Sequence, residues 1–244
     1  MDLLKFHHFD ALDSTNDHLI KMAESGAPEW TVVIADRQTL GRGRRSRDWW
    51  SPDGNLHMSI LLRPTVSPQE LLRLPLTASL AVLSALGSAG SSLTVKWPND
   101  VLLDGRKMAG ILTESRSEGN RVHWAVVGIG VNMVSTKDDI PARLRERMAF
   151  VHELDLILEP NELAVRIARS MKKWSGSMKG KGWERAMEEW SRRADWNTPY
   201  TYRNGIRHIV GVTVRLDDSG GLVMETEDGE MVVYSGEIEE LGES

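Results

Sequence analysis

The residues best suited to chemistry lie in one short run, GRGRRSR, at positions 41–47. Its four arginines keep their charge, and its two glycines let the backbone bend close to a ligand. Arginine forks match phosphate and carboxylate groups bidentately. The run therefore predicts a loop that wraps a ligand with several negative charges, such as a nucleotide or an acyl phosphate. Taken alone, it leaves open a solvated basic turn or an arginine-rich nucleic-acid contact.

Composition narrows these readings of the arginine run. The 244-residue chain has a formal net charge of −5, so the run is a local island of positive charge. This favours a small anionic ligand, and we expect no nucleic-acid partner. The absence of cysteine excludes disulfides, thiolate nucleophiles and cysteine-bound metals. We find neither a signal-peptide pattern nor a run of about 18 apolar residues, so we expect a cytoplasmic protein without membrane contact.

The elements that must position this loop follow from periodicity. Apolar, β-branched residues at 31–38 and alternating apolar residues at 55–64 predict two strands that the arginine run joins. Ser14, followed three residues later by Asp17, predicts a helix over 15–25. The loop is therefore expected at the edge of a sheet that helices cover.

Further strands are predicted at 92–97, 101–103 and 106–115, the last two joined by an Asp-Gly dipeptide typical of tight hairpin turns. A long strand is predicted at 121–133, where two glycines permit a bulge or close approach of the backbone to a ligand. The residues from about 134 to 195 show a helical pattern. Together these elements predict an α+β fold with a mixed, mainly antiparallel sheet flanked by helices.

The last part of the chain changes to a period of two after Pro199. Short strands are predicted around 208–216, 221–226 and 231–234. We therefore predict a large domain over 1–196 and a small β domain over 197–244. The last 29 residues contain ten acidic residues and no lysine or arginine, which we interpret as a solvated surface.

Four strings, in order and in approximate spacing, resemble the biotin protein ligases. They are DSTN at 13–16, GRGRRSR at 41–47, KWPND followed by RKMAGIL between 96 and 112, and VVGIGVN at 126–132. The resemblance covers almost the whole chain and extends to the last part, which resembles the family's small SH3-like barrel. It implies a class II synthetase-like catalytic domain followed by that barrel.

The resemblance also implies a reaction in two steps. Biotin and MgATP give biotinyl-5′-adenylate and pyrophosphate, and a lysine of a carboxylase carrier domain then takes biotin as an amide. The expected substrates are therefore biotin and ATP with Mg²⁺, and the expected partner is a biotin carboxyl carrier protein or domain. We expect no resident metal, because the scattered histidines lack spaced partner ligands.

Individual roles come from the same resemblance. Arg44, Lys107 and Asp100 are the expected catalytic residues, with Lys107 reaching the biotin carboxylate and the phosphate, and Asp100 orienting or deprotonating the incoming lysine. The expected biotin contacts are Ser14, Thr15, Asn16, Gln38, Gly41, Arg42, Gly43, Arg44, Lys107 and Gly110. The expected nucleotide contacts are Arg42, Arg44, Arg45, Arg47, Trp49, Asn99 and Asn132.

Three alternatives and two departures accompany this resemblance. The alternatives are a lipoate ligase, an RNA-binding module that uses Trp49 and Trp50, and a ligase that binds biotin without activating it. The family loop commonly reads GRGRRGR, whereas this chain has Ser46 at the sixth position. Only 13 residues precede Ser14, so we expect the short, monofunctional form without a repressor domain. Family members are monomers or dimers, and we expect a homodimer.

Overall fold

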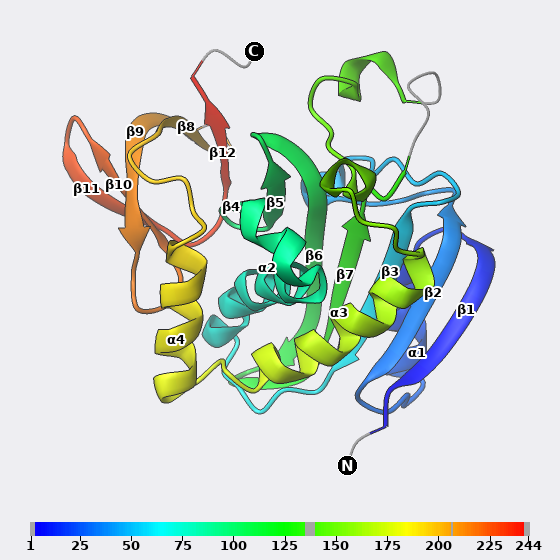
Figure 1. Ribbon diagram of the computed structural model, residues 1–244. Helices are drawn as coiled ribbons and strands as arrows, with labels where there is room; N and C mark the ends of the chain where they lie inside the picture. Colours follow the sequence, from blue (N-terminus) through cyan, green and yellow to red (C-terminus); the bar gives the residue numbers. More distant parts are fainter. Residues whose placement is uncertain (1–2, 135–139, 206, 242–244) are drawn as a thin grey trace.

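The computed structural model describes residues 3–134, 140–205 and 207–241. Its main sheet contains β1 (Lys5–Leu12), β2 (Thr31–Gln38), β3 (Leu56–Leu62), β4 (Thr94–Lys96), β5 (Asp100–Leu103), β6 (Arg106–Glu118) and β7 (Arg121–Val131). The strand order is β1-β2-β3-β7-β6-β5-β4 (Figure 1). Only β1 and β2 run parallel among these neighbouring pairs, and the others are antiparallel. This is the mixed, mainly antiparallel sheet that the sequence predicts.

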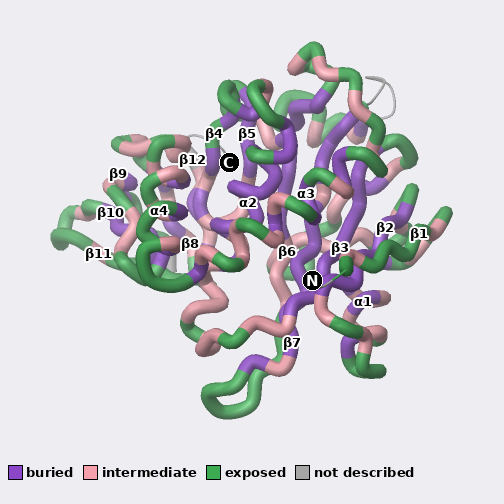
Figure 2. The backbone as a smooth tube through the Cα atoms, turned by 60° about the horizontal axis from the view of Figure 1, so that its bottom comes forward, coloured by how far each residue is buried: buried purple, intermediate pink, exposed green. Residues whose placement is uncertain are grey.

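Helices cover both faces of the main sheet. The α-helices are α1 (Thr15–Glu24), α2 (Arg73–Ala85), α3 (Pro160–Ser175) and α4 (Gly180–Ser191). α2 and α3 share one apolar cluster with alternate residues of β3, such as Met58 and Ile60. α1 packs on the opposite face, where Leu19 meets Leu61. Every residue of β3 is therefore buried, because the strand lies between two helical layers (Figure 2).

The predicted helix near the start of the chain is confirmed as α1. The Ser14 side chain accepts a hydrogen bond from the Asp17 backbone N–H at 3.4 Å, which satisfies one donor of the first helical turn. Thr15 and Asn16 are the first two residues of the helix, and both are buried. The cap therefore fixes two polar side chains against the sheet.

The segment predicted as helical from 134 to 195 is only partly so. Residues 135–139 lie outside the described residues, and the stretch before α3 contains only short 3-10 turns at Ala142–Leu144 and Val151–Leu154. Its backbone bonds instead to the main sheet, since the Lys107 N–H donates to Arg147 O at 2.8 Å and the Ala149 N–H donates to Lys107 O at 2.9 Å. These sheet contacts replace the helical hydrogen bonds.

The C-terminal module is a second, antiparallel sheet. It contains β8 (Pro199–Asn204), β9 (Arg207–Leu216), β10 (Leu222–Thr226), β11 (Gly229–Val233) and β12 (Glu237–Glu240), in the order β11-β10-β9-β8-β12. Tyr200, Leu222 and Met224 of this module belong to the same apolar cluster as α2 and α3. The indole N–H of Trp97 also donates to Gly220 O at 3.2 Å. The small sheet is therefore packed directly onto the larger one.

None of the helices in the described residues combines the length and apolar character that a membrane span needs. The Asp-Gly hairpin between β5 and β6 is confirmed, with positive φ angles of 49° and 74° at Asp104 and Gly105. It places Lys107 at the start of β6 and Asp100 at the start of β5, on neighbouring strands.

Candidate active site

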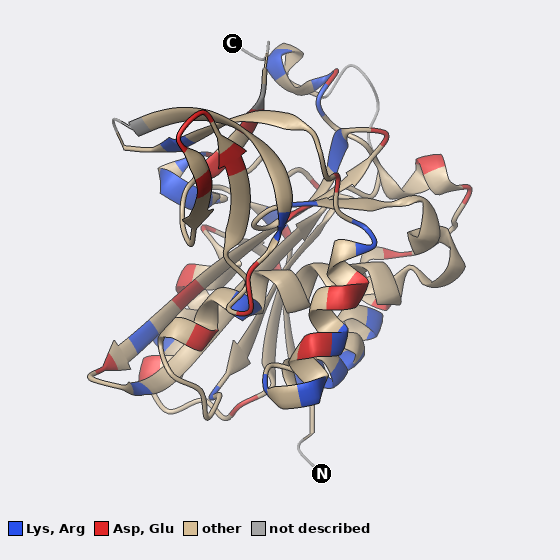
Figure 3. Cartoon of the chain, turned by 90° about the vertical axis from the view of Figure 1, so that its left-hand side faces the viewer, with Lys and Arg blue, Asp and Glu red and all other residues tan. Residues whose placement is uncertain are grey.

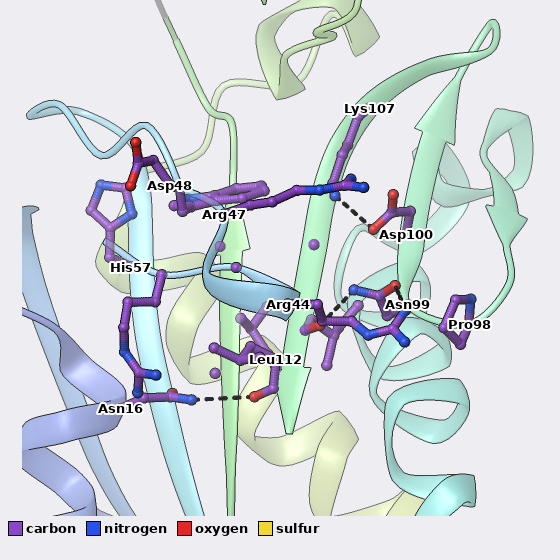
Figure 4. Close-up of a pocket in the computed structure, with 18 of the residues that line it drawn as sticks. Asn16, Arg44, Arg47, Asp48, His57, Pro98, Asn99, Asp100, Lys107 and Leu112 are labelled. Carbon is purple, nitrogen blue, oxygen red and sulfur yellow. Dashed lines mark hydrogen bonds and ion pairs between the residues drawn. The ribbon is translucent and has the colours of Figure 1, made fainter. Parts of the chain in front are cut away.

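One pocket, here called the central pocket, gathers residues from α1, the arginine loop (residues 41–47), β6, β7 and β12 (Figure 4). It collects all the residues expected to be catalytic or to contact biotin or nucleotide, except Gly41, Arg45 and Asn132. These lining residues are Ser14, Thr15, Asn16, Gln38, Arg42, Gly43, Arg44, Arg47, Trp49, Asn99, Asp100, Lys107 and Gly110. Four sequence strings that lie far apart in the chain thus meet in one cavity.

One end of the central pocket is a network of neutral polar groups. The Gln38 side-chain oxygen accepts hydrogen bonds from the Thr15 backbone N–H at 2.8 Å and from its hydroxyl at 3.1 Å. The Asn16 amide donates to Leu112 O at 3.3 Å. The Ser59 hydroxyl lies 2.8 Å from Thr15 Oγ1 and 2.6 Å from Asn16 Oδ1. These groups hold one another in place and present fixed donors and acceptors.

Arg42 belongs to the same end and is paired with two carboxylates. Its Nη2 lies 2.5 Å from Asp17 Oδ1 and 2.8 Å from Glu114 Oε2. Burial alone lowers the pKa of Arg42, but the hydrogen bond and charge of Glu114, followed by those of Asp17, raise it above its ordinary value. One guanidinium between two carboxylates leaves this end of the pocket without net positive charge.

The opposite end, here called the cationic end, presents cationic side chains beside acidic partners. Lys107 Nζ lies 2.7 Å from Asp100 Oδ1, and 5.3 Å from the centre of the Trp49 ring. Arg44 Nη1 donates to Asn99 Oδ1 at 3.3 Å. Burial lowers the pKa of Arg44, and the charges of Glu237 and Asp100 oppose that shift. Figure 4 shows Asn16 and the Lys107–Asp100 pair at opposite sides of the cavity.

Three glycines form the floor between the two ends. A Cβ added at Gly128 would lie 2.2 Å from Asn16 Oδ1, and one at Gly130 would lie 2.5 Å from Trp49 Nε1. At Gly110 an added Cβ would lie 2.8 Å from Trp49 Cζ3. The glycines of β7 thus permit the close approach that the sequence suggests, and the groups that approach are the protein's own Asn16 and Trp49.

Among the described residues, four buried polar atoms of this pocket form no hydrogen bond: Arg42 Nε, Trp49 Nε1, His57 Nδ1 and Asp100 Oδ1, the last of which forms the ion pair with Lys107. Buried polar groups are nearly always paired in folded proteins, because an unmade bond costs about 1–3 kcal/mol. Unpaired atoms gathered around one cavity therefore indicate a site built to bind a polar ligand.

The three residues outside the central pocket support its walls. The Trp49 backbone N–H donates to Gly41 O at 2.8 Å, at the base of the arginine loop. Arg45 donates to Asn204 Oδ1 at 3.1 Å, and the Asn132 amide donates to Lys107 O at 3.0 Å. Direct ligand contacts stay predictions, both for these three residues and for those that line the pocket.

Some pocket residues were missed from the sequence. His57 is buried, with 1% of its surface exposed, and its Nε2 lies 3.1 Å from Pro52 O. Burial lowers its pKa, which favours the neutral ring. Glu237 and Glu239 also line the pocket, although the acidic end of the chain was interpreted as a solvated surface. Their charge, opposite to that of the arginine run, is the signal that could have identified them.

No group of three or more His, Asp or Glu side chains suited to a metal ion occurs among the described residues. The two ends of the central pocket differ in the side chains that line them. One end offers fixed neutral hydrogen bonds, and the other offers Lys107 and Arg44 to an anion.

Comparison with known proteins relates this site to a family. Residues 8–132 match the biotin/lipoate A/B protein ligase family. The chain is also 34% identical to the biotin--[acetyl-CoA-carboxylase] ligase of Paracoccus denitrificans over 232 residues, which cover 93% of this chain and 96% of the relative. This chain belongs to the biotin/lipoate A/B protein ligase family. A second family relative, the bifunctional ligase/repressor BirA of Bacillus subtilis, is 34% identical over 95% of this chain and 73% of its own length.

A solved structure supports the same family assignment. The biotin protein ligase of Aquifex aeolicus, determined in complex with biotin and ATP, matches with a TM-score of 0.81 and 28% identity, covering 97% of this chain and 98% of that one. The family and the fold predicted from the sequence strings are both confirmed.

Proposed function

We propose that this ligase-family chain is a biotin protein ligase. It activates biotin with MgATP to biotinyl-5′-adenylate, releases pyrophosphate, and transfers biotin to a lysine of a biotin carboxyl carrier domain. The observation that carries the proposal is the central pocket, which joins a neutral hydrogen-bonding end at Asn16 to a cationic end at Lys107.

The two ends of biotin correspond to the two ends of the central pocket. Its ureido ring has two N–H donors and one carbonyl acceptor, which suit Thr15, Asn16 and Gln38 together with the neutralised Arg42. Its carboxylate, at the other end of an apolar chain, suits Lys107 and Arg44. The Lys107 ammonium lies against Gly110, and the Asn16 amide donates to Leu112 O, two residues farther along β6. The strand rise then places the two ends on the order of 10 Å apart, which suits a ligand with a polar ring at one end and a carboxylate at the other.

In the first step, a carboxylate oxygen of biotin attacks the α-phosphorus of ATP, and pyrophosphate leaves. Negative charge builds on the α-phosphate as the two anions meet, so fixed cations nearby stabilise the transition state. Lys107 and Arg44 are held at this end by Asp100 and Asn99, respectively. Mg²⁺ enters with ATP as part of the substrate complex.

In the second step, the amine of the carrier lysine attacks the carbonyl carbon of the adenylate, an amide forms, and AMP leaves. The amine must lose a proton before or during the attack. Asp100 lies beside Lys107 at the cationic end of the pocket, which supports the proposal that its carboxylate orients the amine or accepts that proton.

The decisive experiment measures pyrophosphate release from MgATP by the purified protein with biotin, with lipoate, or with neither acid. We expect a burst near one equivalent of enzyme with biotin only. Lipoate lacks the ureido group, so it leaves the polar groups near Asn16 unpaired. A burst with lipoate alone would reassign the substrate, and no burst with either acid would contradict acyl activation.

The acyl acceptor proposed here is the carrier domain of a biotin-dependent carboxylase. Relatives from Paracoccus denitrificans and Mycobacterium tuberculosis are both named biotin--[acetyl-CoA-carboxylase] ligases, which supports this choice. Several expectations from the sequence stay predictions. They are the division into domains at 196/197, a homodimer, a cytoplasmic location, the lack of a repressor function and the lack of a nucleic-acid partner.

A further inference from the structure

The C-terminal module contacts the arginine loop through several polar groups. Arg47 forms an ion pair with Glu237 of β12, and Arg45 Nη1 lies 3.9 Å from the same carboxylate. Arg44 Nη2 donates to Gly236 O at 2.8 Å. Figure 3 shows that acidic residues are frequent on the strands of this module. Three arginines of the loop are therefore bound by a part of the chain about 190 residues away.

Burial distinguishes Glu237 from an ordinary surface acid. Its side chain is only 12% exposed, whereas that of Arg47 is 61% exposed. Glu237 also lines the central pocket. The second acid near Arg47, Glu239, lies 3.8 Å from it and is itself paired with Arg203 Nε at 2.9 Å. Glu237 is thus the carboxylate of the C-terminal module that is most directly engaged with the arginine loop.

A negative charge beside the arginine loop offsets the repulsion among its arginines. Arg44, Arg45 and Arg47 lie within four residues, and like charges at this spacing repel one another and favour an open loop. The largely buried carboxylate of Glu237 beside them cancels part of this repulsion. It also holds the guanidiniums in place before a phosphate binds. Less orientational freedom is then lost on binding.

We propose that Glu237 is a positioning residue for ATP, so that the C-terminal module completes the active site by holding the arginines of the loop toward the pocket. This inference rests on the proposed function, because it assigns the arginines to a nucleotide. Glu237 does not touch the reacting atoms. It acts through Arg44 and Arg47.

The test compares Glu237→Gln with the wild type in the biotin-dependent pyrophosphate assay. We expect kcat/KM for ATP to fall about tenfold or more, because a charge-assisted contact is lost. Biotin affinity measured without ATP should change less than about twofold. Glu237→Asp, which keeps the charge, should recover part of the loss. The matched control is Glu230→Gln, in the same module and paired with Arg215 on the surface, which should have no effect.

A double variant separates positioning from general stabilisation. If Glu237 acts through Arg47, Glu237→Gln combined with Arg47→Gln should lose no more kcat/KM for ATP than the worse single variant. Fully additive losses, or an unchanged kcat/KM in Glu237→Gln, would overturn the proposal. A tighter ATP interaction in Glu237→Gln would overturn it as well, since it would show that the carboxylate competes with phosphate.

Direct ATP binding by calorimetry keeps this inference separate from the proposed function. A wild type that releases no pyrophosphate would refute biotin activation. The inference would still stand or fall on whether Glu237→Gln weakens binding of ATP itself while the thermal midpoint stays within a few degrees of the wild type. Equal ATP affinity in the two proteins would refute the positioning role.

Discussion

Lys107 carries the ammonium group that faces the glycine floor and the carboxylate of Asp100. Lys107→Ala removes this fixed charge, so we expect biotin-dependent pyrophosphate release to fall by roughly 100-fold, or about 3 kcal/mol. Rates from single-turnover experiments with saturating ATP measure this loss. Lys181→Ala, on the exposed surface of α4, is the matched control and should retain the wild-type rate. Near-normal release by the Lys107 variant would remove this lysine from the proposed mechanism.

Ser46, the departure from the common family loop, adopts a left-handed backbone conformation with φ 58°. Glycine has no Cβ to clash in this region, whereas other residues pay about 1–2 kcal/mol. Because glycine also gains entropy when unfolded, we expect Ser46→Gly to raise the free energy of unfolding by up to about 1 kcal/mol. Urea denaturation measures this change. Ser46→Ala keeps the Cβ and should give no gain, and equal stability of both variants would refute the strain.

At the scale of elements, β7 presents Gly128 to the side chain at the start of α1. In Gly128→Ala the new methyl group would lie 2.2 Å from Asn16 Oδ1, so Asn16 must move and the neutral end of the pocket must change. We expect biotin affinity, measured by calorimetry, to fall at least about tenfold. Gly176→Ala meets only backbone oxygens at 3.6 Å or more and should leave biotin affinity unchanged. Wild-type affinity in Gly128→Ala would show that Asn16 does not set the shape of the ligand site.

Elements that depend on local chemistry were predictable from the sequence. The Ser14 cap and the turn at 104–105 follow from neighbouring residues, and the pocket follows from four strings with a known family pattern. β1 was not predicted, because most of its side chains are exposed at the edge of the sheet and show no alternation. Glu237 was not recognised either, since its partner Arg47 lies 190 residues away and only the folded chain brings them together.

At the scale of the whole molecule, the two sheets share one apolar cluster that includes Tyr200, Leu222 and Met224. Trp183 adds a hydrogen bond of 2.7 Å from its indole N–H to Asp218 O. We expect thermal unfolding in a single transition, because neither sheet can separate without exposing this shared surface. Calorimetry checks the expectation through the ratio of calorimetric to van't Hoff enthalpy, which should be close to one. Two resolved transitions would mean that the modules unfold independently.

The ion pair between the arginine loop and β12 has a consequence for how such chains can be recombined. A chimaera that joins this main sheet to the small β module of another ligase would be expected to fold, provided that the shared apolar contacts match. Its rate of catalysis would depend on whether the transplanted module has an acidic residue at the position of Glu237. Two modules whose charges meet across the proposed nucleotide site are therefore expected to be inherited as a matched set.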